Sequence, residues 1–371
     1  MLKIGLIGPL PPPSGGMANQ TLQLASLLRQ SNIQVELIQV NAPYHPMWIS
    51  QFHGLRAIAR LLPYLFQLWR VSGRVNVFHI MGNSGWSWYL FAAPAIWIGS
   101  WHGVRVVLNY RGGEAGVFFE RSFRWIRSTL KRVNQIIVPS GFLEDIFSRY
   151  GFSVSIVPNI INLSRFSPQG RSKNLATTDP HIVVSRNLES IYDIPTAIHT
   201  LKAVHRQFPT ARMTIAGSGA ELESLQALAH ELELSDSIYF TGRIDNDSMA
   251  NLYDSAHIVL NTSLVDNMPI SILEALASGV PVVSTAAGGI PYLITHRIDG
   301  LLTSLRDAEA LAACIIELLK NADLRNRIIS AGLDKVRQFQ WDSVRPKLFA
   351  AYGYSTTDDR YNLSQAGSGA A

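Results

Sequence analysis

Residues 266–283 read DNMPISILEALASGVPVV, and this order predicts a helix that follows one buried strand and precedes another. Pro269 suits the first helical position and Gly279 suits the position just after the last, so we expect the helix over residues 270–278. A helix that begins at the carboxyl end of a strand presents free backbone amides at its start. The amides of residues 268–271 would therefore form a site for a phosphate or diphosphate.

Strand-like runs alternate with helix-length segments on both sides of this stretch. Such alternation is typical of parallel sheets of the doubly wound kind. The polar segment 168–180 interrupts the alternation and has the composition of an interdomain linker. We expect an α/β fold of two Rossmann-like domains, with a ligand in the cleft that faces the carboxyl ends of their strands. The expected strands are 3–7, 35–40, 75–80, 105–110, 135–138, 153–157, 181–185, 212–216, 237–241, 257–261, 280–284 and 300–303.

The composition excludes several classes of protein. The chain has 371 residues, of which 47% are hydrophobic and 16% charged, and it contains one cysteine. A disordered tail, a collagen-like repeat and a disulfide scaffold are all incompatible with these values. Cys314 lies in an apolar helical run, which favours core packing over thiol catalysis. A single unpaired cysteine fits a reducing compartment.

Residues 75–104 contain no Asp, Glu, Lys or Arg, and a stretch of this length could in principle cross a membrane. Gly82, Gly85 and Pro94 interrupt it, however. We expect a strand, a glycine turn and a buried helix over residues 86–98 instead of a membrane span.

Two segments combine basic residues with large apolar ones. Residues 47–74 hold four arginines and no acid among Trp, Phe and Leu side chains, and residues 121–132 hold five basic residues in a similar setting. Helices of this kind can lie in a lipid headgroup layer. Ordinary surface helices of a basic domain would look the same. No recognised nucleic-acid-binding motif accompanies the charge, so nucleic acid is not an expected partner.

Two carboxylates stand out in the second half. Between Asp266 and Arg297 the only charged residue is Glu274. A carboxylate in so apolar a stretch needs polar partners, and sugar or ribose hydroxyls are suitable ones. The alternative is that Asp266 caps the helix region and that Glu274 faces solvent.

This stretch resembles the E-x7-E signature of the retaining GT-B glycosyltransferases of family 4. Asp266 stands where the first Glu is usual, and Glu274 matches the second. The resemblance continues through residues 275–283 and on to Gly288-Gly289-Ile290-Pro291. Further landmarks are Gly15-Gly16 at the start of the first helix, residues 138–140, 157–159 and Phe166 near the domain boundary, and the segments 215–219 and 240–243.

The resemblance implies a nucleotide-sugar donor held mainly by the second domain and transfer with retention at the anomeric carbon. It implies no metal ion and no other cofactor. Glu274 would bind the donor ribose, and Asp266 would address the transferred sugar. Arg186 would contact the diphosphate, and Arg111 would lie near the donor and acceptor. The expected donor-binding residues are Gly15, Gly16, Gly217, Ser218, Arg243, Ile244, Asn267, Met268, Pro269 and Ile270.

The polar segment and the alternation of elements on either side of it suggest how the domains divide. Residues 1–170 would form the acceptor-side domain, 171–180 the linker and 181–340 the nucleotide-sugar-binding domain. Residues 341–371 would supply a terminal helix that returns to the first domain, followed by a frayed tail.

The sequence departs from the family pattern at two basic positions. The family usually has an Arg followed shortly by a Lys on the diphosphate, but Arg186 has no Lys after it in residues 187–193. Either Arg111 or Arg243 substitutes, or stabilisation of the leaving group is weakened. Arg111 also occupies the position of a family His. An Arg there could bind phosphate or form a salt bridge to Glu114 or Glu120.

The sequence therefore predicts a retaining, metal-independent hexosyltransferase of polysaccharide or glycoconjugate biosynthesis. It would transfer a sugar from a UDP-linked donor to a glycan or a lipid-linked acceptor. We expect it in the cytoplasm, with peripheral contact to the inner face of the plasma membrane. The alternatives are a catalytically weak or inactive GT-B protein that binds nucleotide or glycan, and a nucleotide-sugar epimerase or phosphorylase.

Overall fold

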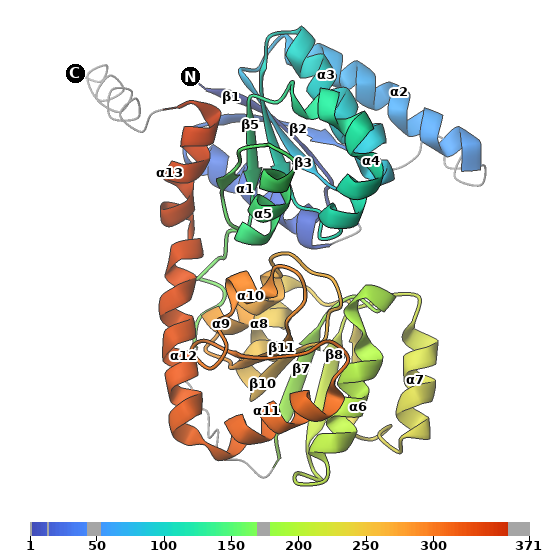
Figure 1. Cartoon of the computed structure of the whole chain (residues 1–371), viewed down its shortest axis with the longest axis vertical. Helices are drawn as coiled ribbons and strands as arrows, with labels where there is room; N and C mark the ends of the chain where they lie inside the picture. The colour runs from blue at the N-terminus through green and yellow to red at the C-terminus, as the bar shows by residue number, and fades with distance from the viewer. Residues whose placement is uncertain (1, 13–14, 43–52, 169–178, 355–371) are drawn as a thin grey trace. The chain divides into compact units, whose positions relative to one another are not determined.

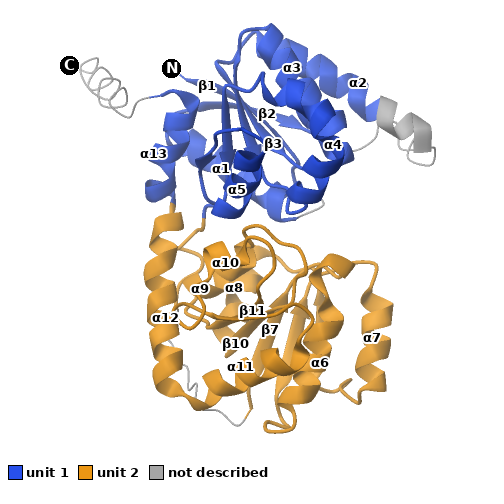
Figure 2. Cartoon of the chain, viewed as in Figure 1, with its two compact units in different colours: residues 1–160, 341–371 blue, residues 161–340 orange. Residues whose placement is uncertain are grey.

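The computed structural model describes residues 2–12, 15–42, 53–168 and 179–354 (Figure 1). The chain forms two compact units, with residues 1–160 and 341–371 in unit 1 and residues 161–340 in unit 2 (Figure 2). Unit 2 starts earlier than the predicted boundary at residue 170, because Ile161 and Phe166 are buried in its core. Most of the predicted linker, and the tail after residue 354, lie outside the described residues.

Unit 1 is built on a parallel sheet of six strands in the order β2-β1-β3-β4-β5-β6. Each strand coincides with a predicted one to within a few residues. Because all pairs are parallel, the carboxyl ends of the strands share one edge of the sheet. The strands are β1 (Lys3–Gly8), β2 (Gln34–Gln39), β3 (Val77–Gly82), β4 (Arg105–Tyr110), β5 (Gln135–Val138) and β6 (Ser155–Ile156).

Helices cover both faces of this sheet. Side chains of α2, α3, α4 and α5 share one core with the sheet, and those of α1 and the C-terminal α13 share the other. The helices are α1 (Gly16–Gln30), α2 (His53–Ser72), α3 (Ala93–Trp101), α4 (Ala115–Leu130), α5 (Gly141–Arg149) and α13 (Trp341–Tyr352).

The uncharged stretch 75–104 forms β3, a turn, the π-helical segment Trp88–Ala92 and α3. The helix predicted over residues 86–98 thus contains a π-helical turn and ends later, at Trp101. Within the described residues, no helix is both long enough and apolar enough to cross a membrane.

Unit 2 repeats this plan with the strand order β12-β11-β10-β7-β8-β9, again all parallel. The helix predicted over residues 270–278 is present as α9 and follows β10. Gly279, which follows the C-cap residue Ser278, has a φ of +67°, which favours glycine. The strands are β7 (His181–Ser185), β8 (Arg212–Ala216), β9 (Ile238–Gly242), β10 (Ile258–Asn261), β11 (Val282–Thr285) and β12 (Leu301–Thr303).

The two faces of the second sheet have separate cores. Cys314 on α11 packs against the first of them, as the sequence predicts. The helices are α6 (Ile194–Val204), α7 (Leu222–Glu231), α8 (Asn246–Ser255), α9 (Ile270–Ala277), α10 (Ile290–Leu293), α11 (Ala308–Lys320) and α12 (Ala322–Val336).

A buried histidine joins α13 to the sheet of unit 1. His79 on β3 lies fully buried, with its Nδ1 2.8 Å from the Tyr352 hydroxyl and its Nε2 3.2 Å from the Asn109 amide nitrogen. Burial, aided by the charge of Arg111, lowers the pKa of His79 to about 3, so the ring is neutral at pH 7. His79 is therefore a satisfied core histidine, and its hydrogen bond fixes where α13 packs.

Replacing Tyr352 with Phe should lower the free energy of unfolding by about 1–3 kcal/mol, because one nitrogen of the buried ring loses its partner. Urea unfolding at pH 7 measures the change. Tyr89→Phe is the control, since Tyr89 is 40% exposed and lies in the same unit. Equal midpoints for the two variants would contradict a structural role for the His79 contact.

Candidate functional site

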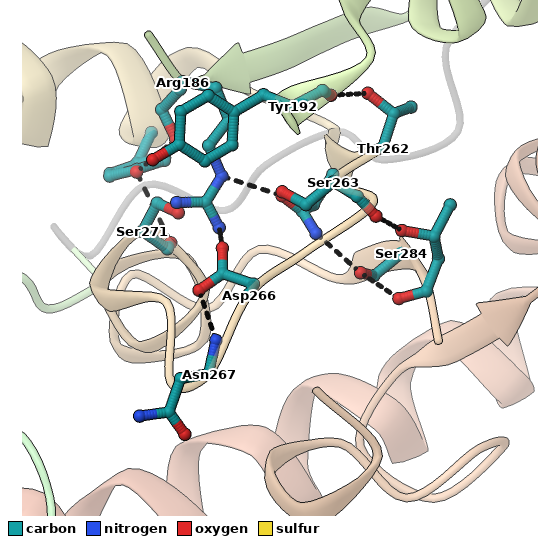
Figure 3. Close-up of polar contacts among 12 residues, drawn as sticks. Arg186, Tyr192, Thr262, Ser263, Asp266, Asn267, Ser271 and Ser284 are labelled. Atoms are coloured by element: carbon teal, nitrogen blue, oxygen red, sulfur yellow. Dashed lines mark hydrogen bonds and ion pairs between the residues drawn. The ribbon is translucent and has the colours of Figure 1, made fainter. Parts of the chain in front are cut away.

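The predicted basic and acidic site residues of unit 2 meet directly. Arg186 follows β7 and Asp266 lies in the loop after β10, so both stand at the carboxyl edge of the sheet. Arg186 Nη2 lies 2.8 Å from Asp266 Oδ2, and the side chains are only 12% and 15% exposed (Figure 3). Arg186 Nε also donates to Asn261 Oδ1 at 2.8 Å. The guanidinium is thus held on two sides.

The contact between Arg186 and Asp266 is an ion pair without the alignment of a hydrogen bond. Both contacting atoms, Nη2 and Oδ2, are buried and have no hydrogen-bond partner within the described residues. Asp266 uses its other oxygen, Oδ1, to accept from the backbone N–H of Asn267 at 2.8 Å. Buried polar atoms without a hydrogen bond are rare in native proteins, and these two lie where the sequence predicts a ligand.

A polar network lies beside this pair, as Figure 3 shows. Asn261 Nδ2 donates to Ser284 Oγ at 2.9 Å, and Ser263 Oγ donates to Asn261 Oδ1 at 2.9 Å. Thr285 Oγ1 donates to the Ser263 carbonyl at 2.6 Å, which joins the ends of β10 and β11. These residues were not predicted from the sequence. Their signal is a run of polar side chains at the end of an otherwise apolar strand.

Glu274 on α9 points inward and not to solvent. The Tyr253 hydroxyl donates to Glu274 Oε2 at 3.2 Å and lies 2.8 Å from Ser185 Oγ. Burial raises the pKa of Glu274 to about 7, against the smaller opposing effects of the Tyr253 hydrogen bond and the Arg186 charge. The alternative of a solvent-facing Glu274 is wrong, and Tyr253 is a partner that the sequence did not reveal.

Asp266 does not cap α9. The residue before the helix is Pro269, and no side chain caps it. The prediction placed Pro269 at the first helical position, and the structure places it one residue earlier. The backbone N–H groups at the start of α9 are accordingly not taken by a capping side chain, and they stand next to the loop that carries Asp266.

Glycines at two places let backbone segments meet at this site. A Cβ added at Gly288 or Gly289 would overlap the carbonyl oxygens of Asp266 and Asn267. Gly289 N–H also donates to the Asp266 carbonyl at 2.9 Å. The Gly288-Gly289 pair of the family signature therefore holds the loop of Asp266 by close backbone contact.

The glycine-containing turn at residues 217–219 holds the loop of Arg186 by the same kind of close backbone contact. A Cβ at Gly217 would overlap the Arg186 carbonyl, and the Leu188 N–H donates to the Ser218 carbonyl at 3.2 Å. Arg243 and Ile244 follow β9 at the same edge of the sheet. Arg243 is exposed and has no ion pair within the described part of the chain.

The predicted residues of unit 1 form a separate group. Arg111 follows β4 and donates to Asn159 Oδ1, and burial lowers its pKa to about 10. It forms no ion pair with Glu114 or Glu120, so the salt-bridge interpretation is wrong. Gly15 and Gly16 start α1, where an added Cβ would meet nothing within 4 Å.

A small cavity of about 20 Å³ lies beside Arg111, with His79, Asn109 and Gln20 among its lining residues. It has room for a single water molecule. Within residues 2–12, 15–42, 53–168 and 179–354, no group of three or more His, Cys, Asp or Glu side chains is placed to hold a metal ion.

Comparison with known families agrees with this geometry. The family model described as "Glycosyl transferases group 1" matches residues 167–335, and the model "Glycosyltransferase Family 4" matches residues 14–165. The chain belongs to the group 1 glycosyltransferases. The model matches cover the Gly15-Gly16 loop in one half and the Arg186, Asp266 and Glu274 cluster in the other.

Curated relatives of this chain include two mycobacterial proteins. The GDP-mannose-dependent alpha-(1-6)-phosphatidylinositol monomannoside mannosyltransferase of Mycobacterium tuberculosis is 27% identical over 60% of the chain, and the match spans 63% of that relative. The phosphatidyl-myo-inositol mannosyltransferase of Mycobacterium leprae is 23% identical over 95% of the chain and 96% of the relative. The chain thus spans less than two thirds of the first of these relatives.

The fold is that of solved GT-B glycosyltransferases. Anabaena Alr3699/HepE, crystallised in complex with UDP and glucose, superposes with a TM-score of 0.72 over 95% of this chain and 100% of that chain, at 17% identity. At this identity the likeness concerns the fold alone.

Gly289→Ala should lower the free energy of unfolding of the chain by about 2–4 kcal/mol, because the new Cβ overlaps the Asn267 carbonyl and the backbone must shift. Gly16→Ala is the matched control. Its Cβ meets nothing, and an added Cβ at a helical position stabilises by about 0.4–1 kcal/mol. Chemical denaturation measures the free energy of unfolding of both variants. An unchanged value for the Gly289 variant would contradict the prediction.

Glu274→Gln should make stability less dependent on pH. The folded-state pKa of about 7 lies above the ordinary value of 4.5, so folding favours the protonated carboxyl and wild-type stability falls as pH rises through this window. The variant has no such proton to lose. Its advantage over wild type should grow by about 1–3 kcal/mol between pH 5 and pH 8.

Urea unfolding at several pH values measures this difference. Glu231→Gln on α7 is the control, since Glu231 is an exposed carboxylate of the same unit. A difference between Glu274→Gln and wild type that does not vary with pH would show that the Glu274 carboxyl is not perturbed.

Proposed function

We propose that this chain is an active, retaining glycosyltransferase that transfers a sugar from a UDP-linked donor to a lipid-linked acceptor without a metal ion. The observation that carries the proposal is the ion pair of Arg186 and Asp266, whose buried Nη2 and Oδ2 atoms lack hydrogen bonds within the described residues. A donor offers partners of both kinds, because phosphate oxygens accept from a guanidinium and sugar hydroxyls donate to a carboxylate.

The role of each residue follows from its position. Arg186 and the amino end of α9 would stabilise the negative charge that develops on the departing diphosphate. Asp266 would accept from a hydroxyl of the transferred sugar. Glu274, already hydrogen-bonded by Tyr253, would accept from the ribose, and ribose hydroxyls would supply donors that favour its ionised form.

The missing Lys calls for a second cation. Arg243 stands at the carboxyl edge of the same sheet and has no ion pair within the described part of the chain, so we assign it this role. An Arg can bind a phosphate through two parallel hydrogen bonds, which a Lys cannot. Arg111 belongs to unit 1, and we propose that it acts on the acceptor or the transferred sugar.

The names of similar proteins support the substrate classes in part. Both mycobacterial relatives are named for phosphatidylinositol acceptors, which favours a lipid-linked acceptor over a free glycan. Donors differ among them, since one relative is named for GDP-mannose and the Anabaena protein was crystallised with UDP and glucose. We propose UDP as the donor nucleotide and the cytoplasmic face of the plasma membrane as the location. Lone Cys314 is in keeping with a reducing compartment.

Calorimetry with UDP, GDP and ADP, and then with their common sugar conjugates, tests the proposal in the presence of EDTA. We expect binding in the micromolar range for UDP and one of its conjugates, and at least about tenfold weaker binding by Glu274→Ala, which loses charged hydrogen bonds. Glu231→Ala on α7 should bind like the wild type.

Other outcomes would change the assignment. Selective binding of GDP would move the donor to that nucleotide, and loss of binding in EDTA would contradict metal independence. Binding without sugar transfer to any lipid-linked or glycan acceptor would favour the catalytically inactive alternative. The anomeric configuration of the product, read by NMR, tests retention, and an epimerised sugar or a sugar phosphate would identify the epimerase or phosphorylase alternative.

A further inference from the structure

Exposed apolar side chains gather on one helical layer of unit 1. Ten large apolar side chains are exposed among the described residues of unit 1. Two of them, Leu22 and Ile156, lie outside this layer. The other eight lie on α2, on α3, on α4 or on the segment between β3 and α3. They are Leu62, Phe66, Trp69, Trp86, Tyr89, Trp101, Val117 and Trp125, and we call them, with their helices, the aromatic layer.

A ring contact and a hydrogen bond join these three helices, which Figure 1 shows on a single side of the sheet. Trp69 on α2 meets the His102 ring at the end of α3 at 4.3 Å between centroids. Trp97 of α3 stacks edge to face with Trp101 and donates to Thr129 of α4 at 3.0 Å. The outward faces of α2, α3 and α4 are therefore continuous.

The charge of this surface is almost wholly basic. The sequence contains no Asp or Glu in residues 37–113 or 121–143. Unit 1 holds 17 Lys and Arg against 8 Asp and Glu, whereas unit 2 holds 15 against 19. The exposed cations on α2 and α4, or within two residues of their ends, are Arg70, Arg74, Arg121, Arg124, Arg127, Lys131 and Arg132.

These cations outnumber the exposed carboxylate on the same helices, which is Glu120 of α4. None of them is in an ion pair within the described residues, and Arg132 instead lies 3.7 Å from the ring centre of Trp97. A partner must accordingly offer negative charge and an apolar phase together. A second copy of this face would bring cation against cation, so self-association does not satisfy it.

We propose that the aromatic layer is a docking surface for an anionic lipid bilayer. Trp and Phe side chains favour the depth of the headgroups, and Arg and Lys beside them contact lipid phosphates. The proposal deepens the proposed function, because it identifies the surface that would bring the enzyme to a lipid-linked acceptor. It rests on surface chemistry alone, and its test requires neither donor nor transfer.

Vesicle flotation with the full chain tests how much the basic side chains contribute to membrane binding. Wild type should bind vesicles of phosphatidylcholine with 30% phosphatidylglycerol and should not bind phosphatidylcholine alone. The double variant Arg124→Gln/Arg127→Gln should bind the anionic vesicles about thirtyfold more weakly, from roughly 1 kcal/mol for each basic side chain at the surface. The control Arg306→Gln/Arg327→Gln removes two exposed cations from unit 2 and should bind like the wild type.

A second pair of variants tests the apolar contribution. Phe66 and Trp125 are 70% and 78% exposed, and Phe66→Ser/Trp125→Ser should weaken binding by about tenfold or more, because two apolar side chains no longer enter the bilayer. Tyr239 and Tyr292 of unit 2 are 68% and 53% exposed, and Tyr239→Ser/Tyr292→Ser is the matched control. Thermal melting confirms that all variants fold.

Brominated lipids give an independent readout of depth. They should quench the tryptophan fluorescence of wild type and quench a Trp125→Phe variant less. Wild type that does not float with anionic vesicles overturns the proposal, as do variants of the aromatic layer that bind no more weakly than their unit 2 controls. Concentration-dependent dimerisation, or binding to a single-stranded oligonucleotide, in place of vesicle binding would assign the surface to that other partner. Sugar transfer to a soluble acceptor would survive all of these outcomes, so they leave the proposed function untouched.

Discussion

The arrangement of the unit 2 site depends on a charge that the fold largely removes from water. Arg186 is 12% exposed, and a guanidinium at such a position is tolerated only if anionic or polar groups surround it. Asp266 supplies the negative charge, and Asn261 supplies its side-chain oxygen Oδ1. Both side chains must then be held in place. The hydroxyls of Ser263 and Ser284 do so by bonding to Asn261, and this accounts for polar side chains at the ends of strands that are otherwise apolar.

Backbone contact supplies the rest of the support. The loop of Asp266 rests against Gly288 and Gly289, and the loop of Arg186 rests against Gly217, at distances that leave no room for a side chain. The two charged residues are thus positioned by glycine-lined backbone segments as well as by hydrogen bonds. Side chains on rigid, closely packed loops keep their geometry better than side chains on open loops, which suits a site that must be ready before its ligand arrives.

The sequence was sufficient for the features that follow from local pattern. The alternation of apolar runs predicted the strands of both sheets, and Pro269 with Gly279 bounded α9 to within one residue. The near absence of other charges between Asp266 and Arg297 marked the two site carboxylates. What the sequence could not provide were contacts between distant segments, since a Tyr253 that bonds Glu274, or an Asn261 that bonds Arg186, has no local signature.

The same limit explains the errors. Glu114 and Glu120 are close to Arg111 in sequence, which made a salt bridge plausible, but the fold brings Asn159 to the guanidinium instead. The domain boundary was placed by composition at the polar segment, whereas burial of Ile161 and Phe166 decides where unit 2 begins. Composition marks where a chain is polar, and only packing shows which core each residue joins.

The ion pair also constrains how a donor could bind under the proposed function. A diphosphate competes with Asp266 for Arg186, and the two anions cannot share one guanidinium without mutual repulsion unless another cation assists. Asp266 is shorter than the Glu of the family signature, and its Oδ1 is already engaged by the Asn267 N–H. Its freedom to withdraw is therefore small, and its carbonyl is further tied to Gly289 N–H. Binding without displacement of Asp266 then requires the positive charge of Arg243 or of the α9 amino end on the other side of the diphosphate, and this is why the absence of the family Lys need not abolish the site.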